Sequence, residues 1–106
     1  MKSDFRQGVE FSHDLIKKHI DRGSKVVDAT TGNGHDTVFL ANLVGKDGFV
    51  WGFDIQKEAV ENTKTYIKKK NFEDNTRIIW DGHENMKKYI NNPVEGILFN
   101  LGYLPS

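Results

Sequence analysis

The chain has 106 residues, of which 37% are apolar, with 15 lysines and arginines balanced by 15 aspartates and glutamates and with no cysteine. This length predicts one small domain spanning residues 1–106. The balanced charge excludes a basic coat over the whole surface, and the absence of cysteine excludes disulfides, thiolate nucleophiles and cysteine-bound zinc. No apolar run approaches the roughly 20 residues that span a bilayer, and Met1–Asp4 does not begin a signal peptide, so we expect a soluble cytoplasmic protein without membrane contact.

Helices and strands are predicted to alternate along the chain. The spacing of apolar side chains predicts helices at Phe11–Asp21, from His35 or Asp36 to Val44, at Gln56–Lys70 and at Glu84–Ile90. Short apolar runs predict strands at Lys25–Ala29, Phe49–Asp54, Arg77–Trp80 and Val94–Phe99. Such alternation implies parallel strands joined by right-handed crossovers. The predicted fold class is therefore α/β, a Rossmann-like doubly wound parallel sheet of about four strands in the order 3-2-1-4, with flanking helices, whose ligands bind beyond the carboxyl ends of the strands.

A glycine-rich segment follows the first predicted strand. Asp28–Thr37 reads DATTGNGHDT, and its glycines let the chain turn sharply and bring backbone N–H groups against a ligand. Its candidate cofactor contacts are Asp28, Thr30, Gly32, Asn33, Gly34, Asp36 and Thr37. Turns rich in glycine and asparagine also join strands to helices where no ligand binds, so a purely structural turn is the alternative.

An acid closes the second predicted strand. Asp54 stands 20 residues beyond Gly34, where a carboxylate can accept hydrogen bonds from both hydroxyls of an adenosine ribose. Ile55 follows it and can press on the flat face of the adenine. A solvated strand end is the alternative, but the loop, the spacing and the strand position together favour an adenosine site.

The residues around the glycines argue against a dinucleotide. Thr37 stands where the dinucleotide fingerprint has a third glycine or alanine, and Asp28 and Asp36 flank the loop with negative charge. At about 4 Å and surface-like screening, like charges repel by several kcal/mol, so two phosphates would be disfavoured here. S-adenosylmethionine joins an adenosine to a cationic ammonium and sulfonium and avoids this repulsion. Asp28 could then hold its ammonium group.

A third candidate contact follows the third predicted strand. Asp81 can accept a hydrogen bond from the adenine amino group, and Gly82 leaves space for the base. A solvated turn that begins a helix explains the same residues equally well. His83 is a weaker candidate, because a lone histidine in a loop is more often polar surface.

The last predicted strand delivers Asn100 to the same edge of the sheet. Methyltransferases that act on amino groups often carry Asn or Asp, two prolines and an aromatic residue here; this chain has Leu101-Gly102 in place of the prolines and keeps the aromatic position as Tyr103. The Asn100 amide oxygen can accept hydrogen bonds from a neutral amine and aim its lone pair at a methyl carbon. Tyr103 can stack on a base or wall the pocket. Asn100 and Tyr103 are therefore the candidate catalytic residues.

Four segments together resemble a known bacterial family. DATTGNGHDT, Phe53-Asp54-Ile55, Gly82-His83-Glu84 and the final Phe99–Pro105 are similar to the family first labelled rRNA methylase. That family is associated with methylating the aminomethyl group of 5-aminomethyl-2-thiouridine at the tRNA wobble position. The resemblance implies a class I methyltransferase with S-adenosyl-L-methionine as cofactor and tRNA as partner. Class I enzymes usually have seven strands, so residues 1–106 are expected to be a partial domain. Its open fourth-strand edge would favour self-association as a homodimer.

Other readings stay open at this point. A nicotinamide-dependent oxidoreductase would share Asp54, and a non-catalytic fragment could bind S-adenosylmethionine or only a protein partner. The lysine clusters at 17–18, 68–70 and 87–88 could touch phosphates, but solvated helix faces explain them as well. The four histidines show no metal-ligand spacing, so no metal is expected.

Overall fold

The computed structural model describes residues 13–14, 16–99 and 102–105. Helical residues 13–14 and 16–19 precede the regular elements. The strands are β1 (Lys25–Asp28), β2 (Phe49–Asp54), β3 (Thr76–Trp80), β4 (Gly96–Phe99) and β5 (Gly102–Pro105). The helices are α2 (His35–Val44) and α3 (Lys57–Lys70), with two 3-10 helices, η1 (Glu73–Asn75) and η2 (His83–Lys88).

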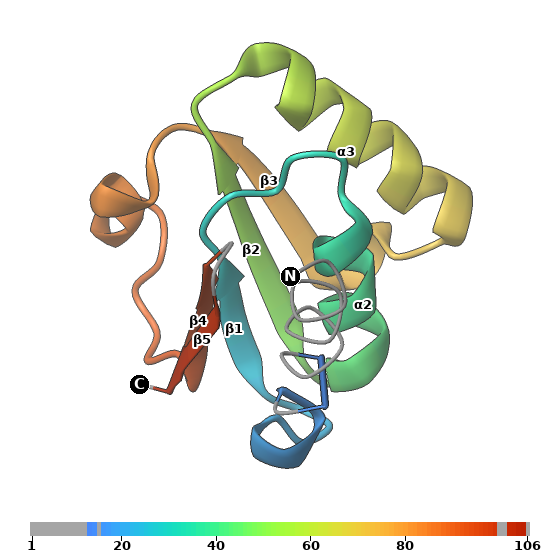
Figure 1. Cartoon of the computed structure of the whole chain (residues 1–106), viewed down its shortest axis with the longest axis vertical. Coiled ribbons are helices and arrows are strands. Elements are labelled where there is room, and N and C mark those ends of the chain that lie inside the picture. The colour runs from blue at the N-terminus through green and yellow to red at the C-terminus, as the bar shows by residue number, and fades with distance from the viewer. Residues whose placement is uncertain (1–12, 15, 100–101, 106) are drawn as a thin grey trace, which may run out of the picture.

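One sheet organises the molecule, with its strands in the order β3-β2-β1-β4-β5 (Figure 1). The first four strands in this order are parallel, which confirms the predicted doubly wound sheet and its order 3-2-1-4. The register pairs Asp28 with Gly52 and with Leu98, and it pairs Asp54 with Trp80. The carboxyl ends of the strands therefore lie along one edge, which we call the rim.

A fifth strand was not predicted. β5 runs antiparallel to β4, with Phe99 opposite Gly102 and Gly96 opposite Pro105. Pro105 has no backbone N–H to donate, and an outer strand tolerates this loss. The predicted open edge at β4 is therefore wrong, because β5 of the same chain covers it.

The segment after β3 also differs from its prediction. A helix was expected at Glu84–Ile90, whereas η2 is a 3-10 helix that begins at His83. The Asn85 N–H donates to the Gly82 carbonyl at 3.0 Å, a three-residue spacing that tightens this turn from its start. The last predicted strand is shorter than expected and begins at Gly96.

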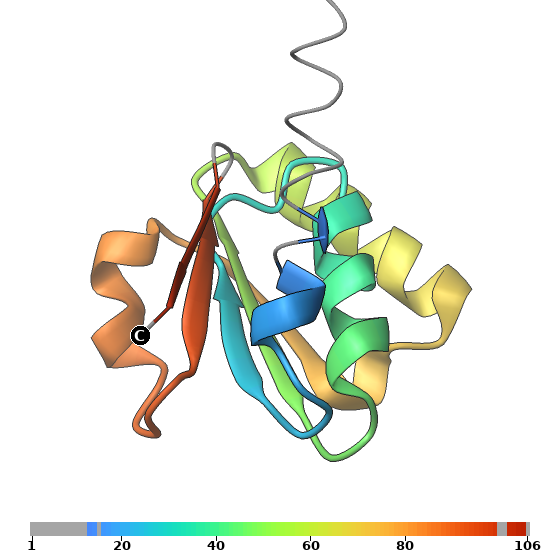
Figure 2. The same ribbon diagram turned by 60° about the horizontal axis from the view of Figure 1, so that its bottom comes forward.

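The core lies on both faces of the sheet, and Figure 2 shows helical segments on either side of it. Successive β1 residues point to opposite faces, so Val26 packs toward α2, Ile16 and Ile20, while Val27 packs with Phe53 toward the other face. Partly buried side chains from η2 and the residues after it cover that second face: Met86, Tyr89 and Ile90. Within the described ranges, no helix has the length and apolar character needed to cross a membrane.

Candidate functional site

Three of the predicted acids meet at the rim. β1 ends at Asp28 and β2 at Asp54, and an isolated bridge pairs Asp54 with Asp81 directly after β3. Adjacent parallel strands that end together bring these carboxylates together, although the residues lie far apart in the chain. The sequence therefore located a shared edge, and the ligand roles of these acids stay predictions.

The glycine loop is fastened to β2 and α3. The Gly32 N–H donates to Asp54 Oδ2 at 3.0 Å, and the Thr63 hydroxyl donates to the Gly32 carbonyl at 3.1 Å. Gly34 has φ +89°, and a Cβ at this position would lie 3.2 Å from the Cα of Thr63. Positive φ and close approach to α3 both favour glycine at this position. The loop is therefore a built turn that holds its backbone against the end of β2.

Asp28 is a buried acid at the centre of the rim. It is 2% exposed, and its Oδ2 accepts a hydrogen bond of 2.7 Å from the Thr37 hydroxyl. The Thr30 N–H donates to Oδ1 at 3.3 Å. Burial raises the pKa of Asp28 to about 7; the charges of Asp36 and Asp54 also raise it, while the two hydrogen bonds oppose the change. The neighbouring charges of Asp36 and Asp54 make this site unfavourable for an anionic group.

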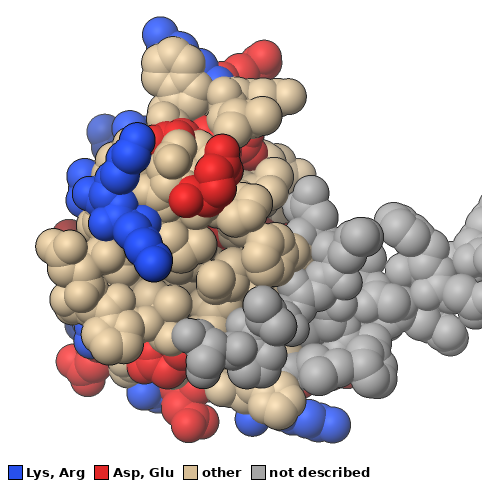
Figure 3. All heavy atoms as spheres, turned by 90° about the vertical axis from the view of Figure 1, so that its left-hand side faces the viewer, with Lys and Arg blue, Asp and Glu red and all other residues tan. Residues whose placement is uncertain are grey.

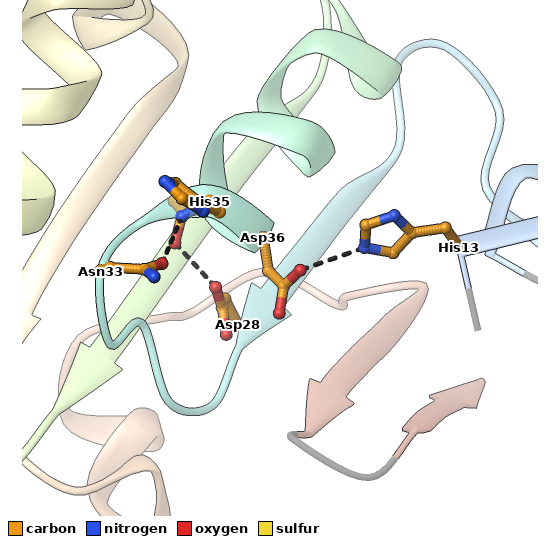
Figure 4. A network of polar contacts seen from close by, with 6 residues as sticks. His13, Asp28, Asn33, His35 and Asp36 are labelled. Atoms are coloured by element: carbon orange, nitrogen blue, oxygen red, sulfur yellow. Dashed lines mark hydrogen bonds and ion pairs between the residues drawn. The ribbon is translucent and has the colours of Figure 1, made fainter. Parts of the chain in front are cut away.

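His13 is a site residue that the sequence analysis missed. Its Nε2 lies 3.1 Å from Asp36 Oδ1, and its ring stacks on Phe39 at a centroid distance of 4.2 Å. Figure 4 shows the Asp28, Asp36 and His13 side chains together at the start of α2. The spacing of His13, Ile16 and Ile20 was the available signal, because these positions share one helical face. The two isoleucines pack on α2, and the same face carries His13 toward Asp36.

The other polar residues of the loop have local roles. The His35 N–H donates to Asn33 Oδ1 at 3.1 Å, so the Asn33 side chain stabilises the entry to α2 (Figure 4). The His35 ring lies 5.0 Å from the Tyr66 ring. Among the described residues, Thr31 Oγ1 is the buried side-chain polar atom without a hydrogen-bond partner. Thr31 was not a predicted contact, and its buried hydroxyl has no partner in this turn.

The Asp81 carboxylate is already engaged by its own segment. Its Oδ1 accepts hydrogen bonds from the Gly82 N–H at 2.7 Å and the Asn85 side-chain amide at 2.8 Å, and its Oδ2 accepts one of 2.7 Å from the Tyr89 hydroxyl. These hydrogen bonds hold the pKa of Asp81 below its usual value, and those from Asn85 and Tyr89 have the largest effect. Asp81 thus ties η2 to the rim, and its Oδ2 keeps one acceptor direction for a ligand.

Gly82 and His83 lie beside this anchor. A Cβ at Gly82 would meet the carboxylate of Glu84, so that side chain fills the space predicted for a base. The His83 ring meets the Phe99 ring edge-on at 5.3 Å. His83 is therefore directed toward the end of β4, which is the side of the predicted acceptor.

Two large apolar side chains are exposed beside Asp54. Ile55 is 71% exposed and Trp80 is 59% exposed, and the Trp80 indole N–H donates to the Ile55 carbonyl at 2.9 Å. Lys57 Nζ lies 5.6 Å from the centre of the Trp80 ring.

A cavity of about 280 Å³ opens next to the glycine loop, at the start of α3. Its lining residues are Gly32, Asn33, Gln56, Glu58, Ala59 and Asn62.

The structure describes only the backbone of one of the two predicted catalytic residues. Asn100 lies outside the described residues. Tyr103 belongs to β5, where its backbone is paired with Leu98. Its side chain is likewise outside the description, so the predicted acceptor contacts of both residues stay predictions.

Several proteins named as methyltransferases or methylases are similar to this chain. The chain is 32% identical over 110 aligned positions to the Arabidopsis thaliana "tRNA (mnm(5)s(2)U34)-methyltransferase, chloroplastic", covering 94% of this chain and 40% of that one. A "putative rRNA-methylase" of Clostridium thermocellum has a TM-score of 0.84 and 50% identity, over 87% of this chain and 51% of that chain. A "putative methyltransferase" of Streptococcus mutans, solved in complex with SAH, has a TM-score of 0.79 and 41% identity, over 93% of this chain and 54% of that chain.

The chain spans only part of these relatives, from 40% to 54% of their length. The model of one protein family also matches residues 50–106, which is just over half of the chain. The matched part runs from within β2 through the end of β5 and includes Asp54 and Asp81. From this match, the chain belongs to the family described as "Putative rRNA methylase".

Proposed function

We propose that this chain carries the cofactor-binding part of an S-adenosylmethionine-dependent RNA methyltransferase. The proposed acceptor is the aminomethyl group of a thiouridine at the tRNA wobble position. The Arabidopsis relative named for this reaction supports the acceptor, and the Streptococcus neighbour solved with SAH supports the cofactor.

The observation that carries the proposal is the cluster of acids around the glycine loop. Asp36 and Asp54 lie close enough to raise the pKa of the buried Asp28 by their charge. A pyrophosphate bound here would face three carboxylates and be repelled. An ammonium group and ribose hydroxyls are hydrogen-bond donors, so a cationic adenosine derivative fits these acceptors.

Each rim acid has a proposed part in holding the cofactor. Asp28, with the loop Gly32–Gly34, would hold the methionine end. Asp54 would accept the ribose hydroxyls, because its two oxygens each carry one backbone hydrogen bond in the structure and keep acceptor capacity. Ile55 would cover a face of the adenine, and the remaining acceptor direction of Asp81 would meet the adenine amino group. When bound, the cofactor supplies a methyl group made electrophilic by its sulfonium.

On the acceptor side, the protein would mainly need to orient the amine toward the methyl group. A primary amine attacks only when it is neutral, so a partly dry pocket that disfavours the ammonium form would help. Asn100 is proposed to accept the hydrogen bonds of this amine through its amide oxygen. Tyr103 is proposed to wall the pocket or stack on the base.

Titration calorimetry with S-adenosylhomocysteine and with NAD tests the cofactor. We expect S-adenosylhomocysteine to bind more tightly, and Asp54→Asn to weaken its binding at least tenfold through the lost ribose acceptor. Asp47→Asn is the matched control, since Asp47 is an exposed acid in the turn before β2, at the opposite end of the sheet. Tighter binding of NAD would favour the oxidoreductase reading and overturn the proposal.

Transfer of a labelled methyl group to tRNA tests the acceptor. We expect labelling of tRNA whose wobble aminomethyl group is unmethylated and none of fully modified tRNA. Equal labelling of both samples would contradict the wobble assignment. Binding of S-adenosylhomocysteine without any transfer would instead favour the reading of this chain as a non-catalytic cofactor-binding part.

A further inference from the structure

Three exposed cations lie on η2 and on the strand before it, in segments that the cofactor proposal does not use. Arg77 comes from β3, and Lys87 and Lys88 come from η2; all three are exposed. Figure 3 looks onto the side of the molecule where η2 lies, and Lys and Arg side chains gather there in one stretch, with a carboxylate beside them. We call Arg77, Lys87 and Lys88 the η2 basic surface.

Two of these cations converge on the anchor of η2. The Arg77 guanidinium carbon lies 5.7 Å from the centre of the Tyr89 ring. The Tyr89 hydroxyl donates to Asp81, and the charge of Lys88 contributes to the lowered pKa of Asp81. The hydrogen bonds of Asp81 therefore tie η2 to the rim, with Lys88 close enough for its charge to act on Asp81.

In the described part of the chain, no carboxylate forms an ion pair with Arg77, Lys87 or Lys88, although the charge of Lys88 acts on Asp81. The contact between His13 and Asp36 involves none of the three cations. Glu84 is the exposed acid of η2, and its carboxylate lies against Gly82. The guanidinium and ammonium groups are thus available to an external anion.

We infer that the η2 basic surface binds the phosphate backbone of RNA next to the acceptor nucleotide. This inference rests on the proposed function and names where that substrate would be held. The acids of the rim repel a polyanion, so an RNA that presents a base there needs cations at the border of the site. A small or neutral substrate would need no such border.

Binding of a labelled RNA hairpin at several salt concentrations tests this inference. The variant Lys87→Ala/Lys88→Ala leaves the contact between Arg77 and Tyr89 in place. The matched control is Lys68→Ala/Lys69→Ala, an exposed lysine pair in the last turn of α3, at the opposite end of the sheet. Both variants remove the same charge, so a difference between them reports position.

Affinity for RNA falls as salt rises, and we expect the Lys87→Ala/Lys88→Ala variant to make this fall less steep. The magnitude of the slope of log affinity against log salt should decrease by about 2, or about 1 for each lost phosphate contact. The control should keep the wild-type slope. In addition, Glu84→Gln should strengthen RNA binding, because it removes a negative charge from η2 itself. The inference would be overturned if both lysine variants lost the same salt dependence, or if Lys87→Ala/Lys88→Ala lost none. It would also be overturned if polyglutamate displaced the labelled hairpin as well as unlabelled RNA does.

Calorimetry with S-adenosylhomocysteine separates this inference from the cofactor proposal. The Lys87→Ala/Lys88→Ala variant should bind S-adenosylhomocysteine as the wild type does, which also shows that it is folded. If the wild type binds S-adenosylhomocysteine but has the same RNA affinity as this variant, only the RNA-binding inference is overturned. If the wild type binds RNA through this surface but binds no S-adenosylhomocysteine, only the cofactor proposal is overturned.

Discussion

At the scale of single residues, Asp28 contributes unfavourably to stability when it is ionised. Its pKa is raised from 3.8 to about 7, mainly by burial, so between these values the folded chain keeps a proton that the unfolded chain has released. The free energy of unfolding therefore falls as the pH rises through this range. An acid kept at such a cost is typical of a functional site.

We expect Asp28→Asn to stabilise the ligand-free protein above neutral pH. An asparagine does not titrate, and its Oδ1 can still accept the Thr37 hydroxyl. The gain over wild type should be small near pH 4, grow by about 1.4 kcal/mol per pH unit up to about pH 7, and level off at roughly 4 kcal/mol. Urea unfolding of both proteins across this range measures the difference, and a constant difference at every pH would contradict the assignment.

The same acid should make cofactor affinity depend on pH. An ammonium group pairs with the ionised form of Asp28, so affinity for S-adenosylhomocysteine should rise up to about pH 7 and level off above it. Below that pH, the affinity should fall by at most tenfold per pH unit. In Asp28→Asn, the affinity should be lower and nearly flat in pH. A wild-type affinity that ignores pH would remove Asp28 from the ammonium contact.

At the scale of elements, the glycine loop depends on its fit to α3. Gly34→Ala would place a Cβ 3.2 Å from Thr63 at a positive φ, and we expect it to destabilise the fold by about 2–3 kcal/mol. Gly23→Ala is the matched control, because Gly23 has a similar φ of +91° but open space around it. It should cost only the backbone strain, about 1 kcal/mol. Equal losses in thermal unfolding would mean that contact with Thr63 is unimportant.

The anchor of η2 makes a spectroscopic prediction. Tyr89→Phe removes a hydrogen bond that favours ionised Asp81, so the pKa of Asp81 should rise toward its ordinary value. Tyr66→Phe is the control, since Tyr66 contacts His35 and Lys70 instead. Carboxyl chemical shifts followed by NMR across acidic pH give both values. An unchanged Asp81 titration in Tyr89→Phe would show that the tyrosine does not hold the anchor.

The sequence predicted the elements that carry strong periodic patterns and missed those set by packing. The run of β-branched residues at Lys25–Asp28 and the long amphipathic α3 could be placed from their patterns alone. β5 could not, because its glycine and proline indicate a loop. Likewise, the strand ends located Asp54 and Asp81, but no local pattern shows that Asn85 and Tyr89 occupy the Asp81 oxygens.

At the scale of the whole molecule, β5 decides which strands are exposed. Its pairing covers β4 and leaves β3 and β5 at the two edges of the sheet. A homodimer was predicted from an open β4, and self-association of the intact chain stays a prediction. Because unpaired strand edges promote association, covering β4 should reduce it.

Removing residues 102–106 should therefore change the oligomeric state. We expect the shortened chain to form dimers or larger species through the uncovered β4, as measured by light scattering at several concentrations. The intact chain at equal concentrations is the reference. A shortened chain that is no more associated than the intact one would mean that β5 does not protect this edge.

The buried carboxyl of Asp28 also has a calorimetric consequence. Near neutral pH about half of the molecules carry a proton there, and an incoming ammonium group would expel it into the surrounding solution. The measured heat of cofactor binding would then include the ionisation heat of whichever buffer takes up that proton. Titrations in phosphate and in Tris at the same pH should give unequal apparent enthalpies, and the inequality should disappear when Asp28 is replaced by asparagine.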